Sequence, residues 1–314
     1  MNENSELFVG IDISKDTLDM GIQPAGQTIP LPHNEPGITE ATRRLLKAQP
    51  RLVVLEATGG LKTALAAALI SAGVPVAVVN PRQVRDYAKA TGQLAKTDRI
   101  DALVLADFAR AIRPEVRPMK DTLTRELDEQ VTRRRQLVEM RVQEYLRLGR
   151  ASKVQQKSLH SHIAWLDKRI EDIDTDLRKR LRASPIWCAK DDLLRSIPGV
   201  DALTSTTLLA KLPELGTLDR KGLAALAGLA PLANDSGKKR GKRIIWGGRA
   251  EVRCALYMPT VTAIRCNPVI HTFAERLKAA GKPAKVVIVA CMRKLLSIMN
   301  AMLKSNAPWN PKIA

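Results

Sequence analysis

The chain has 314 residues and carries 51 Lys+Arg against 32 Asp+Glu, a formal net charge of +19. This length exceeds the usual size of one domain, and the excess of cations favours a polyanionic partner. Nucleic acid fits that partner better than a membrane surface, because the basic residues are spread along the whole chain. Aromatic residues make up only 3% of the chain, which disfavours an aromatic-rich β-sandwich.

The cysteines argue against a zinc site. They are widely separated and form no CxxC pair: Cys188, Cys254, Cys266 and Cys291. The sequence shows no signal peptide and no apolar run near the ~18 residues that a membrane helix needs. We therefore expect a cytoplasmic protein with reduced thiols and no membrane partner.

Short strands and helices alternate through residues 1–117. Residues 7–13 and 17–22 predict a β-hairpin, because two short apolar runs flank a polar turn. Downstream, the pattern predicts strands over 51–56 and 74–79, and helices over 37–48, 61–72, from 81 onward and 97–112. This order predicts an α/β domain with a largely parallel sheet.

Residues 118–184 have a different pattern, with long charged helices and no strands. Apolar residues there follow 3-4-3-4 steps, typical of a heptad seam: Ile163, Leu166, Ile170, Ile173 and Leu177. This pattern predicts two helices that are joined around residues 149–157 and form an antiparallel coiled-coil hairpin. The seam pairs either within the chain or between protomers, and the sequence leaves both open.

Residues 185–314 predict a compact, mainly α-helical domain of short helices separated by Gly and Pro, ending in a buried helix over 284–304. Residues 194–209 resemble a helix-hairpin-helix, whose glycine turn offers backbone N–H groups to a phosphate. Asp201 occupies the second glycine position and Ser205 a small-residue position. We therefore favour a structural role for this turn over phosphate binding.

Four carboxylates form the first candidate site. Asp12 lies within the first apolar strand, Glu56 ends a later one, and Asp98 and Asp101 are three residues apart on one predicted helix face. Hard oxygen donors are what Mg²⁺ prefers, and four can hold two ions for phosphodiester chemistry. Taken singly, each has a structural alternative, such as a helix cap for Asp98. The combination is a ribonuclease-H-like layout.

The second candidate site is a serine beside a cationic segment. Ser236 precedes residues 238–253, which contain seven basic residues and one acid. A serine can attack a phosphodiester when cations stabilise the charge that develops, although a lone loop serine is usually a turn residue. We expect the following cations to contact a phosphate backbone: Lys238, Lys239, Arg240, Lys242, Arg243 and Arg249.

These motifs together resemble the DEDD transposases of bacterial insertion elements, whose N-terminal domain is similar to the RuvC resolvase. The resemblance rests on Phe8-Val-Gly-Ile-Asp-Ile-Ser-Lys15, Leu55-Glu-Ala-Thr-Gly59 and Lys96-Thr-Asp-Arg-Ile-Asp-Ala102. In the second half it rests on Ala225-Leu-Ala-Gly-Leu-Ala-Pro231, the following Asp-Ser-Gly and Trp246-Gly-Gly-Arg249.

The resemblance implies a function and a set of partners. It assigns Asp12, Glu56, Asp98 and Asp101 to Mg²⁺ and Ser236 to the nucleophile. It also implies donor and target DNA, a bridge RNA that guides the choice of sequence, and a homo-oligomer, expected to be a tetramer. Two alternatives remain: a junction resolvase or nuclease that uses water, and a non-catalytic nucleic-acid-binding protein.

Overall fold

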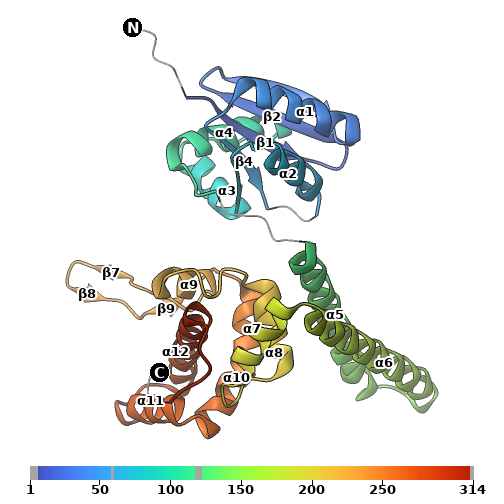
Figure 1. The fold of residues 1–314 in the computed structure, drawn as a ribbon, viewed down its shortest axis with the longest axis vertical. Helices are drawn as coiled ribbons and strands as arrows, with labels where there is room; N and C mark the ends of the chain where they lie inside the picture. The colour runs from blue at the N-terminus through green and yellow to red at the C-terminus, as the bar shows by residue number, and fades with distance from the viewer. Residues whose placement is uncertain (1–5, 58–59, 117–121, 312–314) are drawn as a thin grey trace. The chain divides into compact units, whose positions relative to one another are not determined.

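The computed structural model of the chain describes residues 6–57, 60–116 and 122–311. It separates into two compact units, residues 1–119 and residues 120–314, called unit 1 and unit 2 below (Figure 1). The expected boundary at residue 117 lies in a segment outside the described residues. The further boundary at residue 184, inside unit 2, stays a prediction.

Unit 1 is built around a five-stranded sheet with strand order β3-β2-β1-β4-β5. Its elements are β1 (Phe8–Ile13), β2 (Thr17–Gln23), β3 (Gln27–Pro32), α1 (Glu35–Ala48), β4 (Leu52–Glu56), α2 (Lys62–Ser71), β5 (Val76–Val79), α3 (Pro81–Ala90) and α4 (Asp98–Ile112). Each strand and helix predicted for this part of the chain is present. The hairpin of β1 and β2 is present as well.

The expectation of a largely parallel sheet is wrong. Strands β1, β4 and β5 are parallel, but β2 and β3 add two antiparallel pairs at the other side of the sheet. The sequence did not reveal β3, because Pro30 and Pro32 interrupt the strand pattern. Proline lacks a backbone donor and is tolerated at a sheet edge, where β3 lies.

The two faces of the sheet pack against different helices. Val9, Ile11 and Leu55 point into an apolar cluster that includes residues of α1 and α2. Phe8 and Val54 point into a second cluster, shared with α3 and α4. Because successive side chains alternate between faces, the even-numbered positions of β1 and β4 point towards α4.

Unit 2 contains two long helices, a group of shorter ones and four very short strands. Its elements are α5 (Thr122–Leu148), α6 (Lys153–Ala183), α7 (Pro185–Arg195), α8 (Ala202–Lys211), α9 (Arg220–Leu226), β6 (Pro231–Leu232), β7 (Asp235–Ser236), β8 (Lys239–Arg240), β9 (Ile244–Ile245), α10 (Ala250–Cys266), α11 (Pro268–Ala279) and α12 (Ala284–Ser305). The four strands form two antiparallel pairs, β6 with β9 and β7 with β8. The cationic segment after Ser236 therefore contributes β8 and β9 to a β-ribbon.

The heptad seam is buried inside the chain. Leu166 and Ile170 of α6 pack with Leu137 of α5, and Leu177 joins the main core of unit 2. Two cross-helix ion pairs, Arg134 with Asp174 and Arg141 with Asp167, flank the seam. The hairpin of α5 and α6 thus covers its own apolar stripe, whereas a coiled coil between protomers stays a prediction.

Helix α12 runs through the core of unit 2. It is the one helix in the described part of the chain that is long and apolar enough to cross a membrane, contrary to the expectation that no such run exists. Half of its most apolar window is buried within the fold. Leu295 and Met299 are fully covered by the neighbouring helices, so core packing accounts for its composition. Buried Cys291 belongs to the same helix, and all four cysteines are free.

The turn between α7 and α8 has the structural role that the sequence favoured. Asp201 caps α8, because its carboxylate accepts a hydrogen bond from the backbone N–H of Thr204 at 2.9 Å. Gly199 has a φ of +97° and lies so close to Ala263 of α10 that a Cβ would meet its backbone nitrogen at 2.8 Å. Ser205 is fully buried. This turn therefore packs against α10.

Candidate active site

The parallel pairing of β1 and β4 brings the first two carboxylates together. Ile11 pairs with Leu55, so Asp12 and Glu56 each lie one residue further along, at the carboxyl ends of neighbouring strands. Both occupy even-numbered positions and therefore point towards α4. Both side chains are partly buried. The sheet thus fixes this half of the site.

Helix α4 brings the other two carboxylates. Thr97 caps the helix by accepting a hydrogen bond from the backbone N–H of Ile100 at 3.2 Å, which starts the helix at Asp98. Asp98 and Asp101 both lie in its first turn. Anions there are favoured by the helix dipole, so the local sequence supports both positions before any ligand is considered.

The electrostatics show that the four carboxylates share one neighbourhood. Burial raises the pKa of Asp12, and the charges of Asp101 and Asp98 raise it further. Burial also raises the pKa of Glu56, followed by the charges of Asp12 and Asp101. For Asp101, burial raises the pKa against the opposing effect of Lys96 and Arg85. Carboxylates that repel each other in a partly buried site favour a cation.

The donor set of four carboxylates fits a hard divalent cation. Within the ranges that the structure describes, no side chain forms an ion pair or hydrogen bond with the carboxylates of Asp12, Glu56, Asp98 or Asp101. In the same ranges, no three His, Cys, Asp or Glu side chains converge closely enough to hold a metal ion. Binding therefore requires the side chains to turn inward.

Asp19 is a further acid that the sequence reading missed. It pairs with Asp12 across the β1–β2 hairpin, and its charge contributes to the raised pKa of Asp12. The Oγ1 of Thr17 donates a hydrogen bond to its carboxylate at 3.3 Å. The short turn between the two predicted strands fixes this pairing, so the register of the hairpin could have indicated Asp19. Lys96 and Arg85, whose charges act on Asp101, were not assigned to the site either. Lys96 lies in the same motif as Asp98 and could have been included, whereas only the tertiary fold brings Arg85 to α4.

Ser236 lies on an exposed hairpin of unit 2. It pairs with Lys239, and Gly237 with a φ of +53° and Lys238 form the two-residue turn between β7 and β8. Among the described residues, none forms a hydrogen bond with the Ser236 hydroxyl. The side chain is solvent-exposed on a strand whose neighbours are cations. The structure thus presents a free hydroxyl in a positively charged setting.

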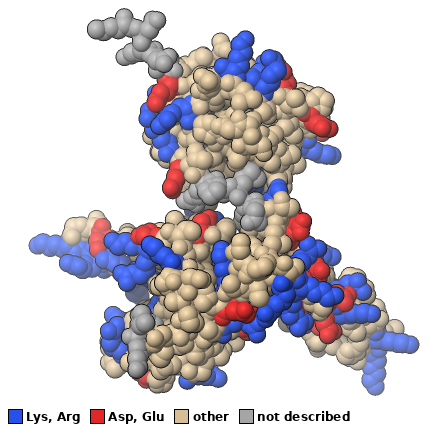
Figure 2. Space-filling view, viewed as in Figure 1, with Lys and Arg blue, Asp and Glu red and all other residues tan. Residues whose placement is uncertain are grey.

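Six cations of this region were predicted to contact nucleic acid, and they fall into two groups. Lys and Arg side chains cover the hairpin in Figure 2. Four are exposed and have no acidic partner within the described chain: Lys238, Lys239, Arg240 and Lys242. Arg243 instead donates two hydrogen bonds to Asp235, at 2.7 and 2.8 Å, and lowers the pKa of that carboxyl. This pair braces the strand that carries Ser236.

Arg249 is also engaged within the fold. It donates two hydrogen bonds of 2.6 Å to the carboxylate of Glu214 and one to the carbonyl of Lys211. Lys211 in turn forms ion pairs with Asp128 of α5 and Glu251 of α10. This network joins α5, α8 and α10. A direct contact of Arg249 with nucleic acid stays a prediction, whereas the structure shows its hydrogen bonds to Glu214 and Lys211.

The comparisons with known proteins define the class of protein as a transposase. Residues 9–151 match a family described as transposase, the DEDD transposases of IS110 type. Residues 191–275 match the family described as transposase IS116/IS110/IS902. The first match contains Asp12, Glu56, Asp98 and Asp101, and the second contains Ser236. A DEDD transposase domain implies a ribonuclease-H-like fold, consistent with the mixed five-stranded sheet of unit 1.

Full-length relatives support the same conclusion. The chain is 32% identical to the pilin gene-inverting proteins of Moraxella lacunata and Moraxella bovis, over 98% of this chain and 99% of each relative. It is 30% identical to the insertion element IS900 uncharacterized 42 kDa protein of Mycobacterium paratuberculosis, over 49% of this chain and 38% of that protein. The chain belongs to the IS110/IS116 family of transposases and related recombinases, a membership that implies DNA strand transfer.

Proposed function

We propose that the chain cleaves and rejoins the DNA strands of an insertion element, with Ser236 as nucleophile and Mg²⁺ held by Asp12, Glu56, Asp98 and Asp101. One observation carries the proposal. The Ser236 hydroxyl is exposed without a partner in the described chain, on a hairpin of unpaired cations. A nucleophile for a polyanionic backbone needs this combination of access and positive charge.

The chemistry follows from the serine. Its Oγ attacks the phosphorus of a DNA phosphodiester and loses its proton, while the bond from phosphorus to one DNA oxygen breaks and that oxygen leaves as a hydroxyl. The phosphate remains linked to the protein as an ester, so a hydroxyl of another strand can reverse the step without ATP. Lys239 and Arg240 stabilise the charge on the phosphate. Asp12, Glu56, Asp98 and Asp101 would hold Mg²⁺, which would supply further positive charge for phosphoryl transfer.

The proposal extends to partners and location. Donor and target DNA are bound in the cytoplasm together with a bridge RNA, and the carboxylates of one protomer of a homotetramer meet the serine of another. The net charge of +19 supports a large nucleic-acid partner. Sequencing the nucleic acid that copurifies with the protein tests for the RNA, and light scattering tests for the tetramer.

A second candidate is site-specific inversion of a DNA segment. The two relatives that match nearly the full chain are named pilin gene-inverting proteins. Inversion uses the same cleavage and joining steps, but exchanges ends within one molecule. A plasmid with two candidate sites in inverted orientation distinguishes the two functions, because inversion changes the restriction pattern without loss of DNA.

The test of the serine is a denaturing gel of end-labelled DNA incubated with protein and Mg²⁺. The wild-type protein should give a covalent protein–DNA band and rejoined product, whereas Ser236→Ala should give neither. Ser158→Ala, another exposed serine of unit 2, is the matched control and should behave as wild type. A band that persists in Ser236→Ala excludes this serine. Hydrolysed product without a covalent band indicates a water-using nuclease, and no product indicates a non-catalytic binding protein.

A further inference from the structure

A cavity of about 1060 Å³ lies in unit 2, on the side of α12 that faces the β6–β9 ribbon. Its floor is apolar and comes mainly from α12, including Val289, Ala301 and Met302. Ile244 and Ile245 of β9 line it from the ribbon. The size is at the upper end of the range for ligand sites, and no predicted site residue other than Arg243 lines it.

All charged residues that line this cavity are cations. They are Arg220, Arg243, Lys285, Arg293 and Lys294, and the described lining contains no Asp or Glu. Arg220, Lys285 and Arg293 have no acidic partner within the described chain. Only Arg243 of this rim has an acidic partner, Asp235, within the described chain. An apolar floor with a largely unneutralised cationic rim fits a ligand that is both apolar and anionic.

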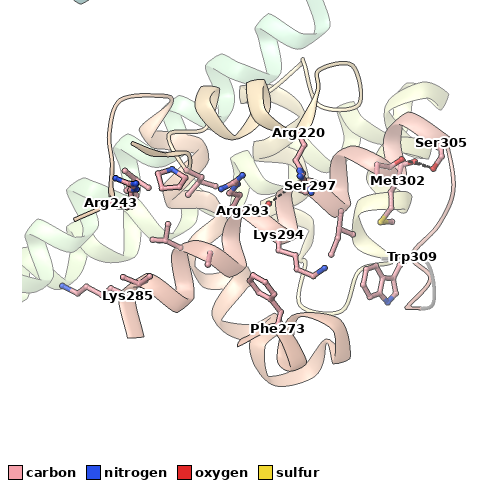
Figure 3. A pocket seen from close by; sticks show the side chains of 18 of the residues that line it. Arg220, Arg243, Phe273, Lys285, Arg293, Lys294, Ser297, Met302, Ser305 and Trp309 are labelled. Carbon is pink, nitrogen blue, oxygen red and sulfur yellow. Dashed lines mark hydrogen bonds between the residues drawn. The ribbon is translucent and has the colours of Figure 1, made fainter. Parts of the chain in front are cut away.

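Two aromatic side chains complete the lining. Figure 3 shows Phe273 and Trp309 on one side of the cavity, with Lys294 between them, and the three arginines along the other. The Nζ of Lys294 lies 5.7 Å from the centre of the Phe273 ring. Bases of an unpaired strand stack on aromatic and apolar surfaces while cations follow their phosphates. A duplex keeps its bases inside and would leave the floor of this cavity unused.

The cavity adjoins the serine hairpin. Arg243 lines the cavity, and its guanidinium also holds Asp235, the residue before Ser236, through two hydrogen bonds. Strand β9, which forms one wall, follows β8 of the hairpin directly in the chain. Arg243 and β9 therefore connect the cavity with the hairpin that carries Ser236.

We propose that this cavity binds unpaired nucleotides of the DNA strand next to the cleaved phosphate, with the bases on the apolar floor and the phosphates on the cationic rim. The proposal rests on the proposed function for the choice of DNA as the strand. It adds a base-binding site to the reaction and predicts that the protein separates base pairs beside the point of cleavage.

The test compares three labelled oligonucleotides by fluorescence anisotropy: an oligodeoxythymidylate, an abasic strand of equal length and a duplex. The wild-type protein should prefer the base-bearing strand to the abasic strand by about tenfold for each stacked base. Ala301→Trp fills the cavity from an exposed position of α12 and should abolish this preference while duplex binding stays unchanged. Ala279→Trp, an exposed alanine of α11 outside the cavity, should keep the preference.

The outcomes separate this proposal from that for Ser236. Binding is measured without Mg²⁺, and Ser236→Ala should retain the preference, so failure of the serine assignment leaves this test intact. Equal wild-type affinity for the two single strands, or an unchanged preference in Ala301→Trp, would overturn the proposal. A stronger cavity-dependent preference for oligouridylate would overturn the choice of DNA. If Ala301→Trp fails to fold, Arg293→Gln decides, because an unchanged single-strand affinity would again overturn it.

Discussion

The backbone of Gly10 in β1 lies directly against Ala106 in α4, so a methyl group at Gly10 would come within 2.3 Å of the Ala106 backbone nitrogen. Gly21, its partner on β2, lies equally close to Ala102. Two residues along β1 cover about 6.7 Å and five residues back along α4 cover about 7.5 Å, so this contact places Asp12 near Asp101. Two glycines thus set the spacing of the carboxylate site.

Gly10→Ala should lower stability and disturb the carboxylates together. Overpacking against a helix backbone costs about 1–3 kcal/mol, which corresponds to a fall in Tm of roughly 2–12 °C for a protein of this size class. Calorimetry of the full chain measures this fall, and metal binding should weaken in parallel. Gly149→Ala meets only one atom, at 3.8 Å, and is the control that should leave Tm unchanged. A Gly10→Ala protein with wild-type Tm would refute the close contact.

Asp12→Asn should stabilise the metal-free protein at neutral pH. The pKa of Asp12 is raised by burial and by Asp101 and Asp98, so the folded state binds protons more readily than the unfolded chain. Stability therefore falls as pH rises from the unfolded pKa, about 3.9, through the raised folded value. The Tm advantage of the variant should be present at neutral pH and vanish below about pH 3.9.

Addition of Mg²⁺ should reverse this order. The ion binds the folded wild-type protein and raises its Tm by mass action, whereas the Asn side chain lacks the charge needed for binding. Asp16→Asn, in the exposed turn after β1, is the matched control and should respond to Mg²⁺ as wild type. An equal gain of Tm in Asp12→Asn would exclude Asp12 as a ligand.

Leu166→Ala should destabilise the α5–α6 hairpin without changing the oligomeric state. Leu166 is fully buried against Leu137 and Ile170 of the same chain, and loss of a buried leucine side chain costs about 2–5 kcal/mol. Thermal unfolding measures the loss, and light scattering measures the mass. Leu146→Ala, at an exposed position of α5, should leave Tm close to the wild-type value. A lower mass for folded Leu166→Ala would show that the seam also joins protomers.

Arg249→Ala should affect stability more than nucleic-acid affinity. The guanidinium makes two hydrogen bonds to Glu214, and hydrogen bonds to charged groups contribute about 1.5–3 kcal/mol. Denaturant unfolding should show this loss, while DNA affinity at moderate salt changes little. Lys242→Ala, an exposed cation of the same segment, should show the opposite pattern. Weak DNA binding by fully stable Arg249→Ala would instead support the predicted direct contact of Arg249 with nucleic acid.

The double replacement Lys239→Ala and Arg240→Ala should weaken DNA binding at low salt and flatten its salt dependence. Both side chains are exposed and without acidic partners in the described residues, and loss of two phosphate contacts reduces the slope of log affinity against log salt by about 2. Affinity measured over a salt series gives this slope. An unchanged slope would show that the hairpin does not follow the DNA backbone.

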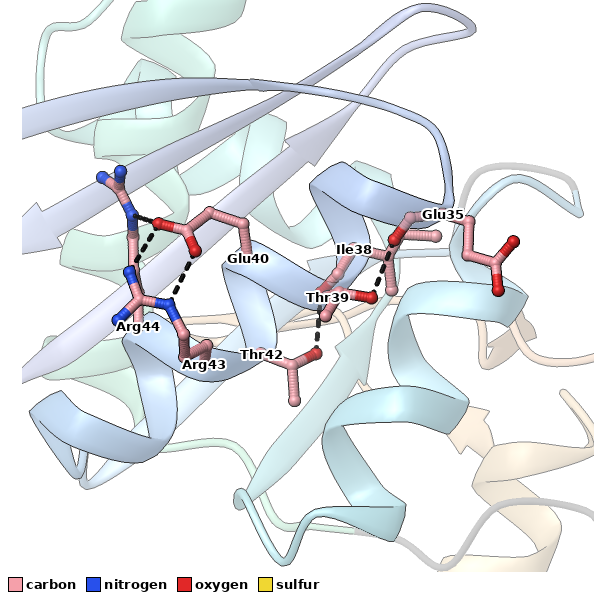
Figure 4. Close-up of polar contacts among 7 residues, drawn as sticks. All are labelled: Glu35, Ile38, Thr39, Glu40, Thr42, Arg43 and Arg44. Carbon is pink, nitrogen blue, oxygen red and sulfur yellow. Dashed lines mark hydrogen bonds and ion pairs between the residues drawn. The ribbon is translucent and has the colours of Figure 1, made fainter.

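A matched pair of arginines on α1 provides the control for this experiment. Arg43 and Arg44 both donate hydrogen bonds to Glu40, which together lower the pKa of that carboxyl to about 2 (Figure 4). Their charge is already balanced in part by Glu40. The double replacement Arg43→Ala and Arg44→Ala removes the same formal charge and should leave the slope close to that of the wild-type protein.

The sequence by itself determined the local features of this protein. The period of apolar residues predicted the strands and helices of unit 1, and Thr97 and Pro81 marked helix starts that the structure contains. Motif order gave the family, which the comparisons then showed. The four carboxylates and Ser236 of the proposed site were also chosen from motifs, and their roles stay predictions. Strands, helices, helix starts and motifs depend on residues that are close together in the chain, so the sequence alone is enough to predict them.

Only the tertiary structure decided which surfaces meet. The proline-bearing strand β3 has a weak strand pattern and becomes ordered by pairing with β2. The seam around Leu166 is buried within the chain because α5 presents a matching apolar stripe. Arg249 meets Glu214 because two distant segments fold together, and Arg243 meets Asp235 because the chain reverses direction at the hairpin. The cavity over α12 gathers residues between 220 and 310. Such contacts depend on side chains far apart in sequence, for which local periodicity carries no information.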